Sequence, residues 1–268
     1  KRQYIYCRIA KMKLPELSTT EFGLVGHPLG HSRSKELFAS WHRSYENFDL
    51  PGLTPEALYR LVLLNPCLKG FNVTIPYKEK IIPLLDKLDA VATKIGAVNT
   101  VKIRRAADGR VLALDGFNTD YAGFMSCVVG ILGQDYAPVQ ALILGTGGAS
   151  KSVAAVLDTL GIGYSFVSRS RQGENIVRYD DLTEAMVADS LLIVNATPLG
   201  TYPDVDTCPP IPYGAVTPRH KCIDLVYNPP VTEFMKRCAA RGAEVVNGLD
   251  MLECQAKASL EIWNNKDI

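Results

Sequence analysis

The sequence Ala-Leu-Ile-Leu-Gly-Thr-Gly-Gly-Ala-Ser, residues 141–150, is the clearest structural signal in the chain. Its apolar start predicts a buried strand, and the glycines at 145, 147 and 148 predict a tight turn. Apolar residues at helical spacing from Val153 to Leu160 then predict a helix that ends at Gly161. This order leaves free N–H groups and the positive end of a helix dipole where a pyrophosphate can bind.

The spacing of the turn is close to that of dinucleotide-binding proteins, which carry G-x-G-x-x-G. The chain has Gly145-x-Gly147-x-x-Ser150, so serine stands at the third glycine position. The strand before the turn and the amphipathic helix after it favour dinucleotide binding. An ordinary glycine-rich turn between a strand and a helix is the alternative.

The next expected strand, 164–168, indicates which nicotinamide cofactor the site takes. It ends in Ser168-Arg169-Ser170-Arg171, and no acidic residue occurs before Glu174. An NAD site places Asp or Glu here for the ribose 2′-OH, whereas an NADP site places Arg and small hydroxyls here for the 2′-phosphate. The residues therefore favour NADP, and a solvated basic loop is the alternative.

Composition excludes several classes of protein. The 268 residues suggest one large or two medium domains, and the hydrophobic content of 47% is ordinary for a globular protein. The net charge of +1 gives no footprint for nucleic acid or an anionic membrane. No apolar run approaches the ~20 residues of a membrane span. The basic residues 1–13 lack a continuous apolar core, so no secretory signal is expected.

Cysteine and histidine placement argues against disulfide and metal sites. The seven cysteines are odd in number, spread out and without a C-x-x-C pair, which fits a reducing cytosol. His27 and His31 are four apart, but Gly26, Pro28 and Gly30 predict a loop rather than a helix. We therefore expect no metal site.

Strand and helix patterns alternate along the whole chain. A helix is expected from Ser32 or Ser34 with Tyr45 on its apolar side, and another at Thr54-Pro55. A short helix is expected to begin at Tyr77. Other expected strands are 22–26, 69–74, 97–103, 111–114, 191–195, 222–226 and 243–246, and other expected helices are 121–132, 232–241 and 251–263. This alternation after residue 140 indicates a parallel sheet covered on both faces.

Eight stretches, in order, resemble the shikimate dehydrogenase family. They are GHPLGHSRS (26–34), GFNVTIPYK (70–78), GAVNT (96–100), GFNTD (116–120), GTGGA (145–149), NATPLG (195–200), DLVYNP (224–229) and GLDMLECQ (248–255). Any one of them is weak, but eight in order over residues 22–263 are highly specific.

The resemblance implies an α/β fold of two domains. An N-terminal α/β substrate domain would comprise residues 1–118 and 248–268, because the C-terminal helix returns to it. A Rossmann-like, parallel-sheet NADP domain would comprise residues 119–247.

The resemblance also implies roles for particular residues. Lys78 and Asp120 look like the catalytic pair that moves the proton. Residues similar to the family's substrate ligands are Ser32, Ser34, Asn72, Thr74, Lys78, Asn99, Asp120, Tyr227 and Gln255. Residues similar to its cofactor ligands are Gly145, Thr146, Gly147, Gly148, Ala149, Ser150, Ser168, Arg169, Ser170, Thr197 and Gly248.

Taken singly, these residue types have ordinary explanations. Serines at a helix start are usually N-caps, and an acid such as Asp120 commonly opens a helix. Lys78 lies in Lys-Glu-Lys, which is typical of a solvated helix face. The asparagines could be turn formers and Gln255 a solvated helix residue.

The chain departs from the family pattern in three places. Lys35 stands where the family has proline, which puts a positive charge near the expected carboxylate site. Asn247 stands where aspartate is common, and Ser-Arg-Ser at 168–170 replaces the common Asn-Arg-Thr.

The resemblance implies an NADP-dependent shikimate dehydrogenase, a cytoplasmic monomer or homodimer that interconverts 3-dehydroshikimate and shikimate in aromatic amino-acid biosynthesis. One alternative is a quinate/shikimate dehydrogenase that uses NAD or NADP. Another is a non-catalytic shikimate or quinate sensor, against which the retention of Lys78 and Asp120 argues. No nucleic-acid or membrane partner is expected.

Overall fold

The computed structural model describes residues 19–29, 32–133, 139–170 and 173–265. The chain divides into two compact units, one of Lys1–Thr119 with Ala258–Ile268 and one of Asp120–Lys257. Each unit is built on its own six-stranded sheet. The expected α/β architecture is therefore confirmed.

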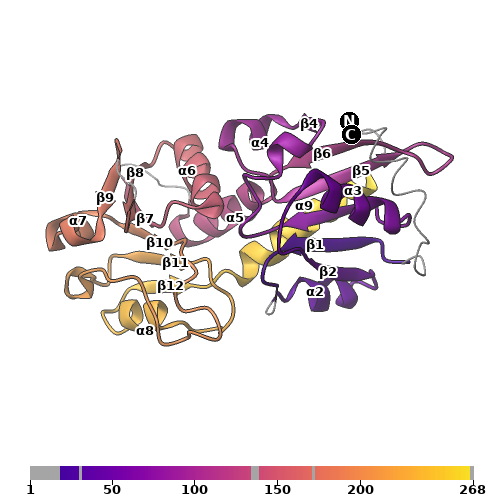
Figure 1. Ribbon diagram of the computed structural model, residues 1–268. Helices are drawn as coiled ribbons and strands as arrows, with labels where there is room; N and C mark the ends of the chain where they lie inside the picture. The colour runs from indigo at the N-terminus through magenta and orange to yellow at the C-terminus, as the bar shows by residue number, and fades with distance from the viewer. Residues whose placement is uncertain (1–18, 30–31, 134–138, 171–172, 266–268) are drawn as a thin grey trace. The chain divides into compact units, whose positions relative to one another are not determined.

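The sheet of the first unit is mixed, with strand order β2-β1-β3-β5-β6-β4. Strand β1 is parallel to β2 and β3, whereas β5 is antiparallel to β3 and β6. The elements are β1 Phe22–Gly26, α2 Ser34–Ser40, β2 Tyr45–Asp49, α3 Pro55–Leu64, β3 Gly70–Val73, η1 Ile82–Leu84, β4 Lys87–Leu88, α4 Ala90–Ile95, β5 Thr100–Arg105 and β6 Val111–Phe117 (Figure 1).

Two expectations for the first unit need correction. Tyr45 begins β2 rather than ending a helix, because α2 stops at Ser40 and His42 has a left-handed φ of 57°. Residues 77–80 form a turn, with Ile81 N donating to Tyr77 O at 3.0 Å, and not an α-helix. Pro83 lies where that helix would continue and has no N–H to donate, which explains the change to the short 3₁₀ helix η1.

The sheet of the second unit is parallel throughout, with strand order β12-β11-β10-β7-β8-β9. This is the doubly wound order, in which successive strands are added outward on one side from β7 and then on the other side from β10. The elements are α5 Asp120–Leu132, β7 Gln140–Leu144, α6 Gly148–Leu160, β8 Gly163–Ser168, β9 Ile176–Arg178, η2 Tyr179–Asp181, α7 Glu184–Asp189, β10 Leu192–Asn195, η3 Tyr213–Ala215, β11 Lys221–Asp224, α8 Glu233–Ala239 and β12 Glu244–Val246 (Figure 1).

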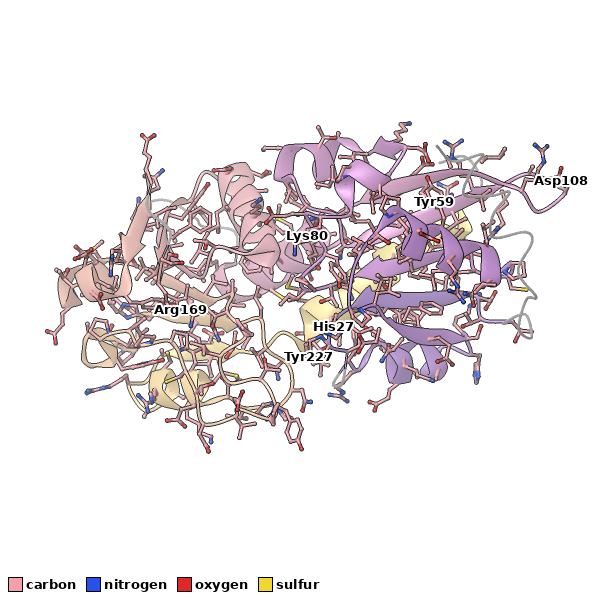
Figure 2. The ribbon with its side chains drawn as sticks, viewed as in Figure 1. His27, Tyr59, Lys80, Asp108, Arg169 and Tyr227 are labelled. Carbon is pink, nitrogen blue, oxygen red and sulfur yellow. The ribbon has the colours of Figure 1, made fainter. Side chains whose placement is uncertain are left out.

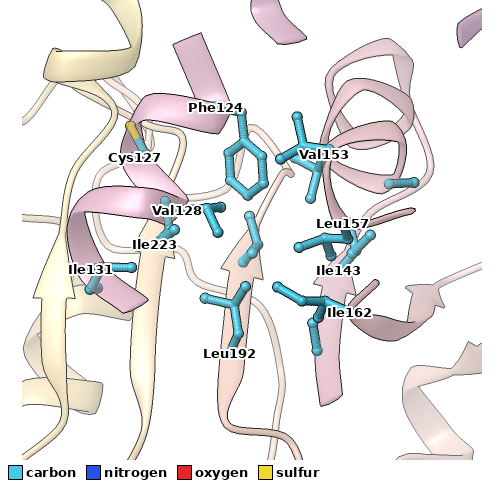
Figure 3. Close-up of a cluster of buried hydrophobic side chains, with 14 of the residues drawn as sticks. Phe124, Cys127, Val128, Ile131, Ile143, Val153, Leu157, Ile162, Leu192 and Ile223 are labelled. Carbon is cyan, nitrogen blue, oxygen red and sulfur yellow. The ribbon is translucent and has the colours of Figure 1, made fainter. Parts of the chain in front are cut away.

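Alternating side chains of β7 supply the cores on both faces of this sheet. Ala141 and Ile143 pack with apolar residues of α5 and α6, as Figure 3 shows for Phe124, Val153 and Ile143. The neighbouring Leu142 and Leu144 belong to a second cluster with residues of α7 and α8. A strand that is buried on both faces has a continuous apolar sequence, and residues 141–144 have this pattern.

The last helix, α9 (Leu249–Asn264), belongs to both units. Met251 at its start packs in a core of the second unit. Trp263 near its end packs in the first unit, where its ring stacks on that of Phe22 with 4.6 Å between the ring centroids. Its Nε1 donates to the Val101 carbonyl at 2.9 Å. The division between the two compact units therefore falls after Thr119 and, within α9, after Lys257.

Candidate active site

The expected cofactor residues lie at one edge of the second unit's sheet, where its parallel strands end. Residues 145–149 follow β7, and Thr197 comes shortly after β10. Ser168 is the last residue of β8, and Arg169, which is labelled in Figure 2, and Ser170 follow it. Gly248 follows β12. Ligands of doubly wound sheets bind outside this edge, at the point where strand order switches.

Gly145 fills a position that admits no side chain. Its φ is +111°, and a Cβ there would lie 3.1 Å from both the Ala196 carbonyl oxygen and Thr197 Cγ2. Its N–H donates to the Val167 carbonyl at 2.8 Å. The turn after β7 is therefore packed directly against the loop after β10, which brings Gly145 and Thr197 together.

Among the described residues, no side chain caps the start of α6. Gly147 is its N-cap and makes no side-chain cap hydrogen bond, and Lys151 N donates to Gly147 O at 3.2 Å. The N–H groups of the first helical turn have no carbonyl partner within the helix, so they suit an anion. Ser150 is fully buried, and its hydroxyl donates to the Gly147 carbonyl at 2.7 Å. Ser150 therefore lies buried in the first turn of α6. In the usual dinucleotide-binding motif this position is a glycine, which allows close packing of the helix on the strand.

The end of β8 carries the expected 2′-phosphate residues. Ser168 is buried, whereas Arg169 and Ser170 are exposed. The Tyr179 hydroxyl is buried and has no hydrogen-bond partner among the described residues. Burial raises the pKa of Tyr179 to about 12, and the nearby Arg169 charge opposes that rise. Sequence patterns gave no signal for Tyr179, and Arg171 lies outside the described residues.

A buried carboxyl group, Asp224, supports the loop after β10. Its oxygens accept from Asn195 Nδ2 at 2.9 Å, Val226 N at 2.9 Å and Thr232 Oγ1 at 2.5 Å. Asn195 Oδ1 in turn accepts from the main-chain N and the hydroxyl of Thr197, at 3.1 and 2.7 Å. Burial raises the pKa of Asp224 to about 6 despite these hydrogen bonds. Asp224 thus holds Thr197 in place through Asn195.

We predict that Asp224→Asn removes a pH dependence of stability. With a folded pKa of about 6 against 3.8, the folded protein holds the extra proton between these values. The stability of the wild type should therefore fall relative to Asp224→Asn as pH rises through this window, by up to about 3 kcal/mol. Urea unfolding of both proteins across the window measures this. A wild-type free energy of unfolding that stays constant or rises relative to that of Asp224→Asn across this window would show that the carboxyl ionises normally in the folded state.

The expected carboxylate-binding serines lie at the start of α2. Ser34 is the first residue of α2 and only 6% exposed, and the structure records no hydrogen bond from its hydroxyl to a described residue. The Ser32 hydroxyl accepts from Ser34 N at 3.2 Å, a local helix-start contact. Lys35 donates to both carboxylate oxygens of Glu46, at 3.0 and 2.9 Å. The lysine that replaces proline is therefore paired with β2.

The loop before these serines is attached to the end of β2. His27 Nδ1 lies 2.6 Å from Asp49 Oδ1, and Leu29 N donates to Asp49 Oδ2 at 3.3 Å. The hydrogen bond from His27 lowers the pKa of Asp49. His31 lies outside the described residues, and no cluster of three metal-binding side chains occurs in the described part of the chain.

The remaining expected site residues fall into both units. Thr74 and Lys78 are half-buried after β3, and the Lys78 carbonyl accepts from Val98 N at 2.8 Å. Asn72 and Asn99 are buried in the same unit. In the second unit, the buried Asp120 begins α5, Tyr227 is half-buried after β11, and Gln255 on α9 donates to the Leu252 carbonyl at 3.0 Å.

Two other classes of feature are absent from the described residues. None of their helices is both long and apolar enough to cross a membrane. The six cysteines among them are free thiols.

Comparison with known proteins gives a consistent result. Residues 24–101 match the model of the shikimate dehydrogenase substrate binding domain. The shikimate dehydrogenase (NADP(+)) of Moorella thermoacetica is 37% identical, over 93% of this chain and 90% of that protein.

Solved structures share the fold over most of their length. Shikimate 5-dehydrogenase of Thermus thermophilus, in complex with NADP(H) and shikimate, has a TM-score of 0.75 at 32% identity, covering 91% of this chain and 93% of that one. Quinate dehydrogenase of Corynebacterium glutamicum, in complex with NAD, has the same TM-score of 0.75 at 27% identity, with the same coverage of 91% and 93%. With sequence identity extending across both units, the chain belongs to the shikimate dehydrogenase family.

Proposed function

We propose that the chain is an NADP-dependent shikimate dehydrogenase, which interconverts 3-dehydroshikimate and shikimate in aromatic amino-acid biosynthesis. The observation that carries the proposal is the doubly wound second unit with Gly145 at its switch point and Arg169 at the end of the next strand. Relatives with this activity in their names match the chain almost end to end.

The residues of the second unit fit the dinucleotide. Gly145 makes the tight turn after β7, and Gly147 leaves open space where a Cβ would lie, so that a pyrophosphate can approach the main chain closely. The first turn of α6 offers main-chain N–H donors. Arg169, with Ser168 and Ser170, supplies a cation and hydroxyls for a 2′-phosphate. The proposed contacts at this edge also include Thr146, Gly147, Gly148, Ala149, Ser150, Thr197 and Gly248. When bound, NADPH supplies the hydride that reduces the ketone carbon.

Neutral polar side chains recognise the substrate in this account. Ser34 offers a buried hydroxyl to the carboxylate, with Ser32 beside it and Tyr227 as a further contact. Asn99, Thr74 and Gln255 offer hydrogen bonds to the ring hydroxyls. Such a site rejects analogues that lack a hydroxyl, because its own polar groups would then stay unpaired.

Lys78 and Asp120 handle the proton. As hydride reaches the ketone carbon, the Lys78 ammonium donates a proton to the developing alkoxide, and solvent then reprotonates the amine. In the oxidation of shikimate the Lys78 amine would accept the proton of the hydroxyl group, and bound NADP would supply the acceptor for the hydride of the same carbon. Asp120 is the second member of the proposed catalytic pair.

The proposal includes the first unit as the substrate domain and the second as the NADP domain. The enzyme works in the cytoplasm as a monomer or homodimer. Oxidation of NADPH on addition of 3-dehydroshikimate to the purified protein tests the function directly. A folded protein that leaves NADPH unchanged would overturn the proposal.

Ser34→Ala should raise the KM for shikimate about tenfold, because a charge-assisted hydrogen bond to the carboxylate is lost. The kcat and the KM for NADP should change little. Ser40→Ala is the matched control, since Ser40 ends the same helix and is exposed. An unchanged KM for shikimate in Ser34→Ala would leave Ser34 with a structural role only.

A further inference from the structure

Six polar side chains form a hydrogen-bonded cluster inside the first unit. They come from β2, from β3, from β5 and the residue just before it, from the segment after β6, and from α9. Each is at most 5% exposed. The members of this buried polar cluster are Tyr45, Asn72, Asn99, Thr100, Thr119 and Ser259. Only Asn72 and Asn99 belong to the expected substrate ligands.

The cluster fixes which way the Asn99 amide points. Asn99 Oδ1 accepts from the Thr119 main-chain N at 2.7 Å and from the Thr100 hydroxyl at 3.1 Å. A flipped amide would set its NH₂ group against the Thr119 N–H, donor against donor. The oxygen is therefore committed to the protein. The nitrogen carries two hydrogens and donates to Thr119 Oγ1 at 2.9 Å, and it is the end of the amide that can donate to a substrate oxygen.

Thr100 is the centre of the cluster. Besides Asn99 Oδ1, its hydroxyl meets Asn72 Nδ2 at 3.0 Å, Ser259 Oγ at 2.8 Å and Thr119 Oγ1 at 3.1 Å. Ser259 also meets Thr119 Oγ1 at 3.1 Å. Loss of the Thr100 hydroxyl would leave several buried polar groups short of a partner, which they can recover only by moving.

Ser259 connects the cluster to α9. The same part of α9 is held on β5 by Trp263 Nε1, which donates to the Val101 carbonyl at 2.9 Å. Lys102 Nζ adds a hydrogen bond to the Ile262 carbonyl at 3.0 Å. Val101 and Lys102 follow Thr100 directly, so these contacts hold α9 on the part of β5 that carries Thr100, and they keep Ser259 within reach of its hydroxyl.

Asn72 works inside the cluster. Its Oδ1 accepts from the Tyr45 hydroxyl at 2.9 Å, and its Nδ2 donates to Thr100 Oγ1 and, at 2.9 Å, to Ser259 Oγ. The nitrogen also lies 3.2 Å from the Asn99 carbonyl, so three acceptors of the first unit surround its two hydrogens, and the oxygen is engaged as well. Asn72 therefore supports its neighbours rather than contacting the substrate ring.

We propose that Thr100 and Ser259 are positioning residues for substrate recognition, which hold the Asn99 amide with its nitrogen as the donor to a ring oxygen. The inference rests on the proposed function, because it takes Asn99 as a ligand of the substrate ring. A nitrogen donor suits both members of the redox pair, since hydroxyl and ketone oxygens both accept a hydrogen bond. The cluster thereby lets one side chain bind substrate and product in the same way.

The test compares Thr100→Val, which keeps the shape and removes the hydroxyl, with Thr100→Ser, which keeps the hydroxyl. We expect Thr100→Val to raise the KM for shikimate about tenfold, with the KM for NADP within about twofold of the wild type. Thr100→Ser should restore the wild-type KM for shikimate. In an Asn99→Ala background, Thr100→Val should add less than about twofold, because the hydroxyl acts through Asn99.

Ser259→Ala gives a second route if Thr100→Val does not fold, and it should raise the KM for shikimate in the same direction. A merely structural cluster would lower the thermal midpoint of these variants and leave both KM values unchanged. Equal KM values for Thr100→Val and Thr100→Ser in an active enzyme would overturn the inference alone. A wild-type protein without shikimate turnover would overturn the proposed function, and the inference with it.

Discussion

Lys78→Ala is expected to lower kcat for shikimate oxidation by two or more orders of magnitude, with little change in the affinity for shikimate. Removal of a general acid or base costs about 10²–10⁴ in rate. Shikimate binding is expected to persist, because the proposed carboxylate and ring contacts come from other residues, among them Ser34 and Asn99. Steady-state kinetics with NADP, together with calorimetric titration of shikimate, separate the two effects.

Lys80→Ala is the matched control for this variant. Lys80 lies two residues further along the same turn and is exposed; it is labelled in Figure 2. It carries the same charge and has no role in the proposed chemistry, so its kcat should match the wild type. Turnover of Lys78→Ala near the wild-type level would remove Lys78 from the mechanism.

Arg169→Ala is expected to lower kcat/KM for NADP by about a hundredfold and to leave kcat/KM for NAD nearly unchanged. The reason is that only NADP carries the 2′-phosphate, and charge-assisted hydrogen bonds to such a group are each worth about 1.5–3 kcal/mol. The measurement is steady-state kinetics with each cofactor at saturating shikimate.

Arg241→Ala controls for the loss of one positive charge from the second unit. Arg241 follows α8 and precedes β12, at the amino end of that strand, opposite the edge that carries Arg169. Its cofactor preference should equal that of the wild type. Equal losses for NADP and NAD in Arg169→Ala would show that Arg169 does not read the 2′-phosphate.

Local patterns in the sequence predicted much of the fold. The apolar run 141–144, the glycine turn and the helix that ends before Gly161 are confirmed as β7 and α6. The Thr54 cap is also confirmed, since its hydroxyl accepts from Ala57 N at 3.1 Å. These features succeed because the residues that determine them are neighbours in the chain.

Features that depend on distant residues were not predicted. Tyr45 was expected on a helix, but it pairs with Phe22 in the sheet and donates to Asn72, which is 27 residues away. Asn72 and Ser259 are 187 residues apart, so no local pattern indicates that they share a cluster. The unusual pKa of Asp224 likewise follows from its burial in the folded unit, although the stretch that contains it was recognised.

The helix α9 contains a division between the two compact units that no local sequence pattern indicates. Its sequence reads as one continuous helix, and nothing in its periodicity tells which core each half joins. Met251 and Trp263 are both apolar, yet they pack in different units. Only the tertiary contacts separate them.

The most direct test of the account is the reduction of nicotinamide by the purified protein with shikimate or quinate, each against NADP or NAD. Absorbance of the reduced cofactor reports all four pairs in one experiment. The account predicts rapid reduction with shikimate and NADP, and much slower reduction with the other three pairs. Preference for quinate or NAD would contradict it, and so would a folded protein that binds shikimate but reduces neither cofactor.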